Sequence, residues 1–63
     1  MQHTPTLKDP DAAAYIGLST AYLKKGRLRG RGPDFVRVGR SVRYRTIDLD
    51  RWLEAHLVKV NGR

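Results

Sequence analysis

The first apolar stretch of the chain is a short run of good helix formers. The run Ala12–Ile16 follows Asp9 and Pro10 and is closed by Gly17. An aspartate can cap the first N–H groups of a helix, proline suits the first helical position, and glycine is favoured just past the end. The sequence therefore predicts a first helix that begins at Pro10, is capped by Asp9 and ends before Gly17.

A second helical stretch starts immediately after that turn. Ser19 is a favoured N-cap, so the helix should run from Thr20 to about Lys25 or Arg27, and Gly26 weakens it by about 1 kcal/mol relative to alanine. Two helices joined by a glycine turn at this spacing are typical of a helix-turn-helix. The glycines and the proline of 27–34 predict a loop after the second helix.

The pattern then changes to alternation between apolar and polar residues, which is the period of a half-buried strand. It does so in Phe35–Val38 and in Ser41–Arg45, and Gly39-Arg40 between them suits a two-residue type II′ turn of a β-hairpin. The residues expected to face inward are Val36, Val38, Val42 and Tyr44. Those expected to face solvent or a partner are Arg37, Ser41, Arg43 and Arg45.

Helical spacing returns after Thr46, a good N-cap, and an apolar stripe opposite a polar face indicates an amphipathic third helix. The stripe consists of Leu49, Trp52, Leu53, Leu57 and Val60, and the polar face of Asp48, Asp50, Arg51 and Glu54. His56 falls on the stripe, and we expect His56, Trp52 and Tyr15 to pack in the core.

These elements predict one small α+β domain of winged helix-turn-helix type, with a helix-turn-helix, a β-hairpin wing and a C-terminal helix. We expect residues 1–6 to form a flexible leader, 7–57 the domain and 58–63 a C-terminal tail. A chain of 63 residues buries only about 60% of the surface that it exposes when unfolded, so we expect a thin core without room for a deep catalytic cleft.

The composition argues against several classes of site. There is no cysteine, and the two histidines lie far apart in the sequence, so neither a metal site nor a cofactor is expected. The acidic pairs Asp9/Asp11 and Asp48/Asp50 lie at predicted helix starts, where capping and the helix dipole explain them. The protein is therefore predicted not to be an enzyme. Its polar first residues and the lack of a long apolar run predict a cytoplasmic protein without a membrane segment.

The distribution of charge is the property of the sequence that bears most directly on function. The chain carries a net charge of +7, from 13 basic and six acidic residues. Nine of the basic residues lie between Tyr22 and Arg45, where Asp34 is the single acid, and we call 22–45 the basic segment. Clustered charge of one sign is typical of a nucleic-acid binder, whereas a surface that is merely solvated interleaves both signs.

The second predicted helix overlaps the start of the basic segment, and an α-helix fits the major groove of B-DNA with its first turns near the base edges. The candidates for base reading are Thr20, Ala21 and Lys24, and the candidates for phosphate contacts beside them are Ser19, Tyr22 and Lys25. Two competing interpretations stay open: Ser19 serves only as a helix cap, and Tyr22 is partly buried in the core.

The predicted hairpin supplies the second half of the basic segment. Arg40, Ser41 and Arg43 lie at or near its tip, where they could reach a flanking backbone or an adjacent minor groove. Arg37 on the same hairpin is a further candidate DNA contact. The loop arginines Arg27, Arg29 and Arg31 either contact phosphates or are mobile, and the sequence leaves both alternatives open.

Three stretches resemble small excisionase-type domains, which are also called recombination directionality factors. Ala12–Ser19 looks like their first helix and turn, Gly32–Tyr44 like their loop and wing, and Asp48–Leu53 like their closing helix. The resemblance covers residues 7–57 with two departures. Lys8 stands where the family usually has serine or threonine, and Gly26 stands where many relatives carry a large residue.

The resemblance implies a MerR-like winged-helix fold that binds attachment-site DNA of phages and integrative elements. Such proteins bend DNA, often as a cooperative row of protomers, and direct a tyrosine-type integrase towards excision. The implied partners are double-stranded DNA, an integrase and further copies of the chain.

Other functions remain open. Small phage-type transcriptional regulators share the same domain. An RNA-binding protein and a module that docks on an acidic protein are two more alternatives. Sequence-specific RNA binders stack bases on exposed aromatic rings, whereas Phe35, Tyr44 and Trp52 are expected to be buried.

Overall fold

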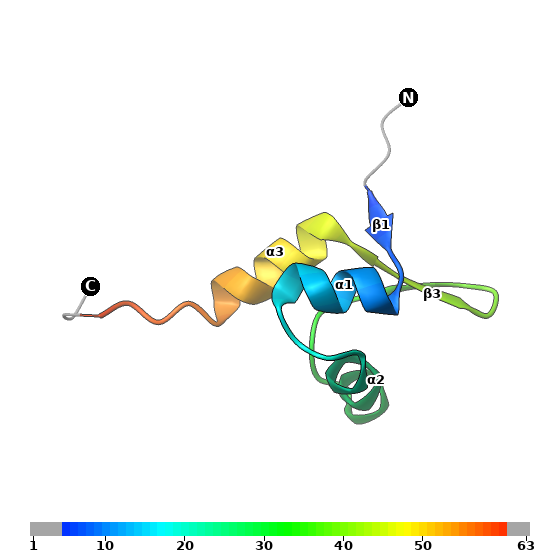
Figure 1. The fold of residues 1–63 in the computed structure, drawn as a ribbon, viewed down its shortest axis with the longest axis horizontal. Helices are drawn as coiled ribbons and strands as arrows, with labels where there is room; N and C mark the ends of the chain where they lie inside the picture. Colours follow the sequence, from blue (N-terminus) through cyan, green and yellow to red (C-terminus); the bar gives the residue numbers. More distant parts are fainter. Residues whose placement is uncertain (1–4, 61–63) are drawn as a thin grey trace.

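Short strands and helices follow one another along the chain in the computed structural model, which describes residues 5–60 (Figure 1). In chain order they are β1 (Thr6–Leu7), α1 (Asp9–Ile16), α2 (Thr20–Arg29), β2 (Val36–Val38), β3 (Ser41–Arg45) and α3 (Thr46–Ala55). The protein is a small α+β domain, as predicted. The two predicted helices before the hairpin, the hairpin and the helix after it are all present, with shifted ends.

The sheet has three antiparallel strands in the order β1-β3-β2, so β3 is the central strand. β1 pairs Thr6 with Arg45 and Leu7 with Tyr44. The prediction of a flexible leader over 1–6 is therefore wrong at Thr6, and residues 1–4 lie outside the described part of the chain. A strand of two residues shows no alternation, so the sequence pattern could not reveal it.

The predicted hairpin is confirmed. Val38 pairs with Ser41 across the two-residue turn Gly39-Arg40. Gly39 has φ +60°, the left-handed backbone that the first central position of such a turn requires. A residue with a Cβ would be strained there, which explains why the turn falls at this glycine.

The faces of the hairpin differ from the prediction. Directly paired residues of antiparallel strands lie on one face, and Val36 pairs with Arg43, an odd-numbered position. Val36 and Val38 thus face away from the side that carries Val42 and Tyr44, and Val38 is 65% exposed. A two-residue turn places even-numbered positions of one strand opposite odd-numbered positions of the other, so the four predicted inward residues cannot share a face.

The core lies between the three helices and one face of the sheet. Its fully buried apolar side chains are Ala12, Ala13, Leu23, Tyr44 and Leu49, and the half-buried side chains packed against them are Leu7, Ile16, Phe35 and Val42. α1 packs against α2, α3, β1 and β3 and is the central helix. Figure 1 shows α1 in the middle, α2 below it, the hairpin to the right and α3 to the left.

α3 begins at Thr46 itself, whereas the sequence predicted Thr46 as the residue that caps the helix. Arg45 is the N-cap, and its side chain makes no cap hydrogen bond. The Thr46 N–H donates to the Pro5 carbonyl oxygen at 3.1 Å, which ties the start of α3 to the residue before β1. The backbone carbonyl of Pro5 thus satisfies one of the N–H groups at the start of α3 that have no acceptor within the helix.

The predicted apolar stripe of the third helix is wrong beyond its second turn. α3 ends at Ala55, and Leu57 and Val60 lie beyond it at 61% and 72% exposure. His56, which was expected in the core, is exposed, and its Nδ1 lies 2.8 Å from the Trp52 carbonyl oxygen. Figure 1 shows the reason, because this end of α3 extends past α1 and the sheet and no other described element covers it.

Tyr15 joins α1 to α3 at the surface rather than in the core, so its predicted burial is wrong. Its side chain is 46% exposed, and its hydroxyl donates to Asp50 Oδ1 at 2.7 Å. The carboxylate acceptor raises the pKa of Tyr15. α1 turns Ala12, Ala13 and Ile16 toward the core, and Tyr15 lies to one side of these three positions.

Asp48 is buried, although the sequence predicted it on the polar face. Its carboxylate is 4% exposed and accepts two hydrogen bonds from Arg45, Nε to Oδ2 at 2.6 Å and Nη2 to Oδ1 at 3.0 Å. These hydrogen bonds lower the pKa of Asp48, against the opposing effect of burial. Arg45, which was predicted to face solvent or a partner, thereby links β3 to α3.

Replacing Asp48 with asparagine is expected to lower the free energy of unfolding at neutral pH by about 1–2 kcal/mol, because the half-exposed Arg45 loses its charged acceptor. A carboxyl group whose pKa is depressed in the folded state stabilises the fold above about pH 4 and loses that contribution as the pH falls further. Urea unfolding from pH 7 down to pH 2 should show this loss in the wild type and less of it in Asp48→Asn.

Glu54→Gln is the matched control, because it removes an exposed carboxylate from the same helix. This variant should keep most of the acid dependence of the wild type. An equal flattening of the pH profile in both variants would contradict the role given to Asp48.

Candidate nucleic-acid interface

α2 is longer than predicted and runs through Gly26 to Arg29. Ser19 caps it, as predicted, by accepting a hydrogen bond from the Tyr22 N–H at 3.1 Å. Gly26 is buried, and a Cβ at this position would lie 2.7 Å from the carbonyl oxygen of Arg31. The absence of a side chain thus lets the loop after α2 fold back against the helix, which a larger residue would prevent.

Arg27, a predicted phosphate contact, points into the protein from α2. Its Nη1 and Nη2 donate to Asp9 Oδ1 and Oδ2 at 2.8 and 3.1 Å, and Nη1 also donates to the Tyr44 hydroxyl at 2.8 Å. The side chains of Arg27 and Asp9 are only 16% and 18% exposed. The hydrogen bonds that Arg27 donates to Asp9 raise the pKa of Arg27, so this guanidinium is a charged link between α1, α2 and β3.

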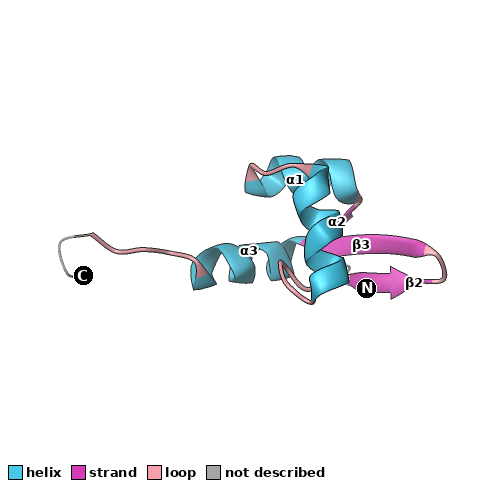
Figure 2. Ribbon diagram, turned by 90° about the horizontal axis from the view of Figure 1, so that it is seen from below, coloured by secondary structure: helices cyan, strands magenta, loops and turns pink. Residues whose placement is uncertain are grey.

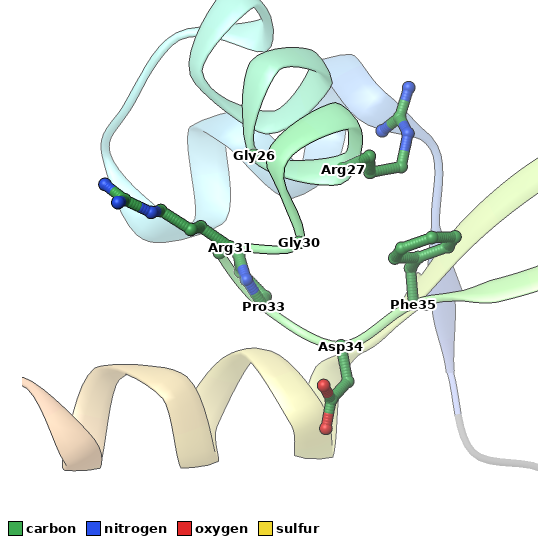
Figure 3. A pocket seen from close by; sticks show the side chains of 8 residues that line it. Gly26, Arg27, Gly30, Arg31, Pro33, Asp34 and Phe35 are labelled. Carbon is green, nitrogen blue, oxygen red and sulfur yellow. The ribbon is translucent and has the colours of Figure 1, made fainter.

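Asp9 therefore has a different role from the predicted one. Lys8 is the N-cap of α1 and makes no side-chain cap hydrogen bond, so the prediction that Asp9 caps this helix is wrong. Figure 3 shows Arg27 and Phe35 on one side of a hollow of about 290 Å³ beside the end of α2, with Arg31 pointing away on the other side. A phosphate would have to compete with Asp9 for Arg27, and Arg31 meets no such competitor among the described residues.

The outward side of α2 carries four residues at positions i, i+3, i+4 and i+7, which we call the outer face of α2. They are Ala21, Lys24, Lys25 and Leu28. All four are exposed, and Leu28 is 87% exposed. The structure thus brings three predicted site residues together with one that the sequence analysis missed. Continuing the helical spacing for seven residues beyond Ala21 would have found Leu28, but the helix was predicted to stop before it.

The flank of α2 that faces α3 carries Tyr22. Its side chain is 41% exposed, and its ring meets Trp52 edge-on with the ring centroids 5.9 Å apart. Tyr22 is therefore an exposed residue outside the core, so its predicted partial burial in the core is wrong, and its ring connects α2 to α3. Thr20, at the start of the helix, is half-buried. The cations on this flank, around a hollow of about 170 Å³, are Lys25, Arg29 and Arg31.

The hairpin carries the second group of predicted residues. Arg37, Arg40 and Ser41 are exposed, and Arg43 is half-buried with an Nε that has no hydrogen-bond partner among residues 5–60. A hollow of about 380 Å³ separates the hairpin from the start of α1, and its lining includes Arg40, Ser41, Arg43 and Lys8. Lys8 is not among the predicted site residues because it stands alone in the sequence, and the fold brings it beside the hairpin.

Most cations of the basic segment form no ion pair within residues 5–60. Of the nine, Arg27 and Arg45 pair with Asp9 and Asp48, which leaves seven. Figure 2, seen from below, has α2 in front of the base of the hairpin, with the hairpin loop projecting to its side. Figure 1 agrees, since it looks along α2 and has α2 below the hairpin. Both elements are therefore open to one partner that approaches from that direction.

Within the described part of the chain, no group of three or more histidine, aspartate or glutamate side chains could hold a metal ion. No helix there is long and apolar enough to cross a membrane. No protein-family model matches the chain, and no curated protein matches its sequence. The function is therefore inferred from the arrangement of charge and shape around α2 and the hairpin.

Proposed function

We propose that the protein is a winged helix-turn-helix domain that binds double-stranded DNA sequence-specifically and catalyses no reaction. The clustering of positive charge on α2 and the hairpin supports this most. Seven cations that form no ion pair within residues 5–60 are spread over α2, the loop after it and the hairpin, and α2 and the hairpin are accessible from one side (Figure 2). A summed positive field attracts a polyanion, and phosphate neutralisation supplies much of the affinity for DNA.

In this proposal α2 lies in the major groove, which is wide enough for an α-helix. Ala21 and Lys24 of the outer face read base edges, together with Thr20 in the first turn. Lys25 and Ser19 hold phosphates beside the groove. The Ser19 oxygen already accepts a backbone N–H, but its hydroxyl hydrogen remains available to a phosphate oxygen.

The hairpin acts as the wing. Arg40 and Ser41 at its tip contact the flanking backbone or reach an adjacent minor groove, where a narrow width concentrates negative potential. Arg43 and Lys8 add positive charge around the hollow of about 380 Å³ between the wing and α1. Contacts from a helix and from a wing at two places on the duplex fix the domain in one orientation.

The resemblance to excisionases supports a narrower proposal. The protein would bind and bend attachment-site DNA, as a row of protomers, and direct a tyrosine-type integrase towards excision. A small transcriptional regulator is the alternative that the same domain supports. Duplexes selected from a random pool distinguish the two, because tandem sites spaced by about one helical turn or less support an excisionase and a lone site supports a regulator.

Duplex binding measured as a function of salt tests the DNA-binding proposal. If about five phosphates are neutralised, log affinity should fall with log salt concentration at a slope of about −4.5. DNA should also win in competition with RNA of the same sequence, because α2 fits the major groove of B-DNA, whereas the major groove of an RNA duplex is deep and too narrow for side chains to read. A flat salt profile, or a preference for RNA, would contradict the proposal.

A further inference from the structure

Leu28 is the most exposed large apolar side chain of residues 5–60, at 87% exposure. It lies in the last turns of a capped helix rather than in a tail. Its neighbours on the outer face, one turn earlier, are Lys24 and Lys25, and Arg29 follows it in the sequence. An apolar side chain thus stands within a surface that is otherwise cationic.

The fold gives Leu28 no internal role. The side of α2 that meets the rest of the protein is occupied by Leu23 and Gly26, which are buried, and by Arg27, which pairs with Asp9. An isolated exposed leucine is ordinary on a protein surface. Leu28 differs from an ordinary exposed leucine because it shares the outer face of α2 with the residues that contact DNA in the proposed function.

We propose that Leu28 is a specificity residue that packs against the C5 methyl group of a thymine in the major groove. This inference rests on the proposed function. The surrounding cations select an anionic partner, and the thymine methyl is the apolar group that B-DNA presents on the floor of its major groove. A residue seven positions after Ala21 lies two turns further along the same helix face, so Leu28 reads a different base step from the one near the start of α2.

Duplexes in which deoxyuridine replaces thymine test this directly, because the replacement removes only the C5 methyl group. With a site selected by the wild type, replacing one particular thymine should weaken wild-type binding about threefold to tenfold, the expected effect of uncovering one or two apolar groups. Leu28→Ala should lose about the same factor on the thymine duplex and should then be insensitive to the replacement. Leu28→Met, which keeps an apolar side chain, should retain most of the sensitivity.

Val58→Ala is the matched control, since Val58 is 81% exposed but lies after α3. It should bind both duplexes like the wild type, and melting curves should show that all three variants are folded. If Leu28→Ala responds to every thymine replacement as the wild type does, the inference is wrong although DNA binding stands. The inference is also wrong if Leu28→Ala abolishes self-association of the DNA-free protein, because Leu28 would then belong to a contact between protein copies. If the wild type binds no duplex, the proposed function and this inference fail together.

Discussion

Arg27→Met is expected to lower the free energy of unfolding by about 3–5 kcal/mol, a large part of the stability of so small a domain. Methionine retains apolar contact with Phe35, whose ring centroid lies 5.9 Å from the Arg27 Cζ, but it removes every donor to Asp9 and Tyr44. The Asp9 carboxylate, 18% exposed, would then have neither a counter-ion nor full hydration. Urea and thermal unfolding measure the loss.

A second substitution shows whether the unpaired Asp9 carboxylate causes the loss of stability. Asp9→Asn added to Arg27→Met should recover part of the stability, because a neutral amide is cheaper to bury than an unpaired carboxylate. Arg29→Met removes an exposed arginine from the same helix and should change the stability by less than about 0.5 kcal/mol. Equal stability of Arg27→Met and Arg29→Met would show that the ion pair does not hold α2 in place.

Removing one proposed phosphate contact from α2 and one from the hairpin should have the largest effect on DNA binding. The double variant Lys25→Ala/Arg40→Ala is expected to bind duplex DNA about 50-fold more weakly near 0.1 M salt, and the slope of log affinity should change from about −4.5 to about −2.7. Both side chains are exposed and form no ion pair within residues 5–60, so the fold should be unaffected. Fluorescence anisotropy over a series of salt concentrations gives both quantities.

The control has to remove the same net charge from elsewhere. Arg51→Ala/Lys59→Ala does so on α3 and the segment after it, away from the outer face of α2 and the hairpin. Screening weakens distant charges at this salt concentration, so this variant should bind within a few-fold of the wild type. Equal losses in the two double variants would mean that net charge alone, and no defined surface, attracts the DNA.

The order of elements could be predicted because local residues mark their boundaries. Gly17 ends α1, Ser19 caps α2 and Gly39 turns the hairpin, as predicted. Features that depend on neighbours distant in sequence could not be predicted in the same way. β1 exists because Thr6 and Leu7 lie beside β3, and the end of α3 loses its apolar environment because no other described element extends that far.

The candidate interface also combines features set by local sequence with features set by residues distant in the sequence. The exposed positions Lys24, Lys25 and Arg40 follow from helical spacing and from the hairpin turn, and the structure leaves all three exposed. Arg27 looked the same in the sequence, but its partners stand 18 and 17 residues away and became visible only in the fold. Leu28 was not predicted because the second helix was expected to end before it, whereas α2 continues to Arg29.

The two-residue strand β1 also affects how the protein behaves when many copies are present. An unpaired strand edge is a template onto which another chain can add, and β3 offers only short edges because β1 pairs with Tyr44 and Arg45 on one side and β2 with Ser41–Arg43 on the other. β1 itself is too short to recruit a partner, and β2 has only three residues with Arg37 in the middle. Shortness and charge both discourage strand addition, so a concentrated solution of this small domain is protected from fibre-like aggregation by its sheet.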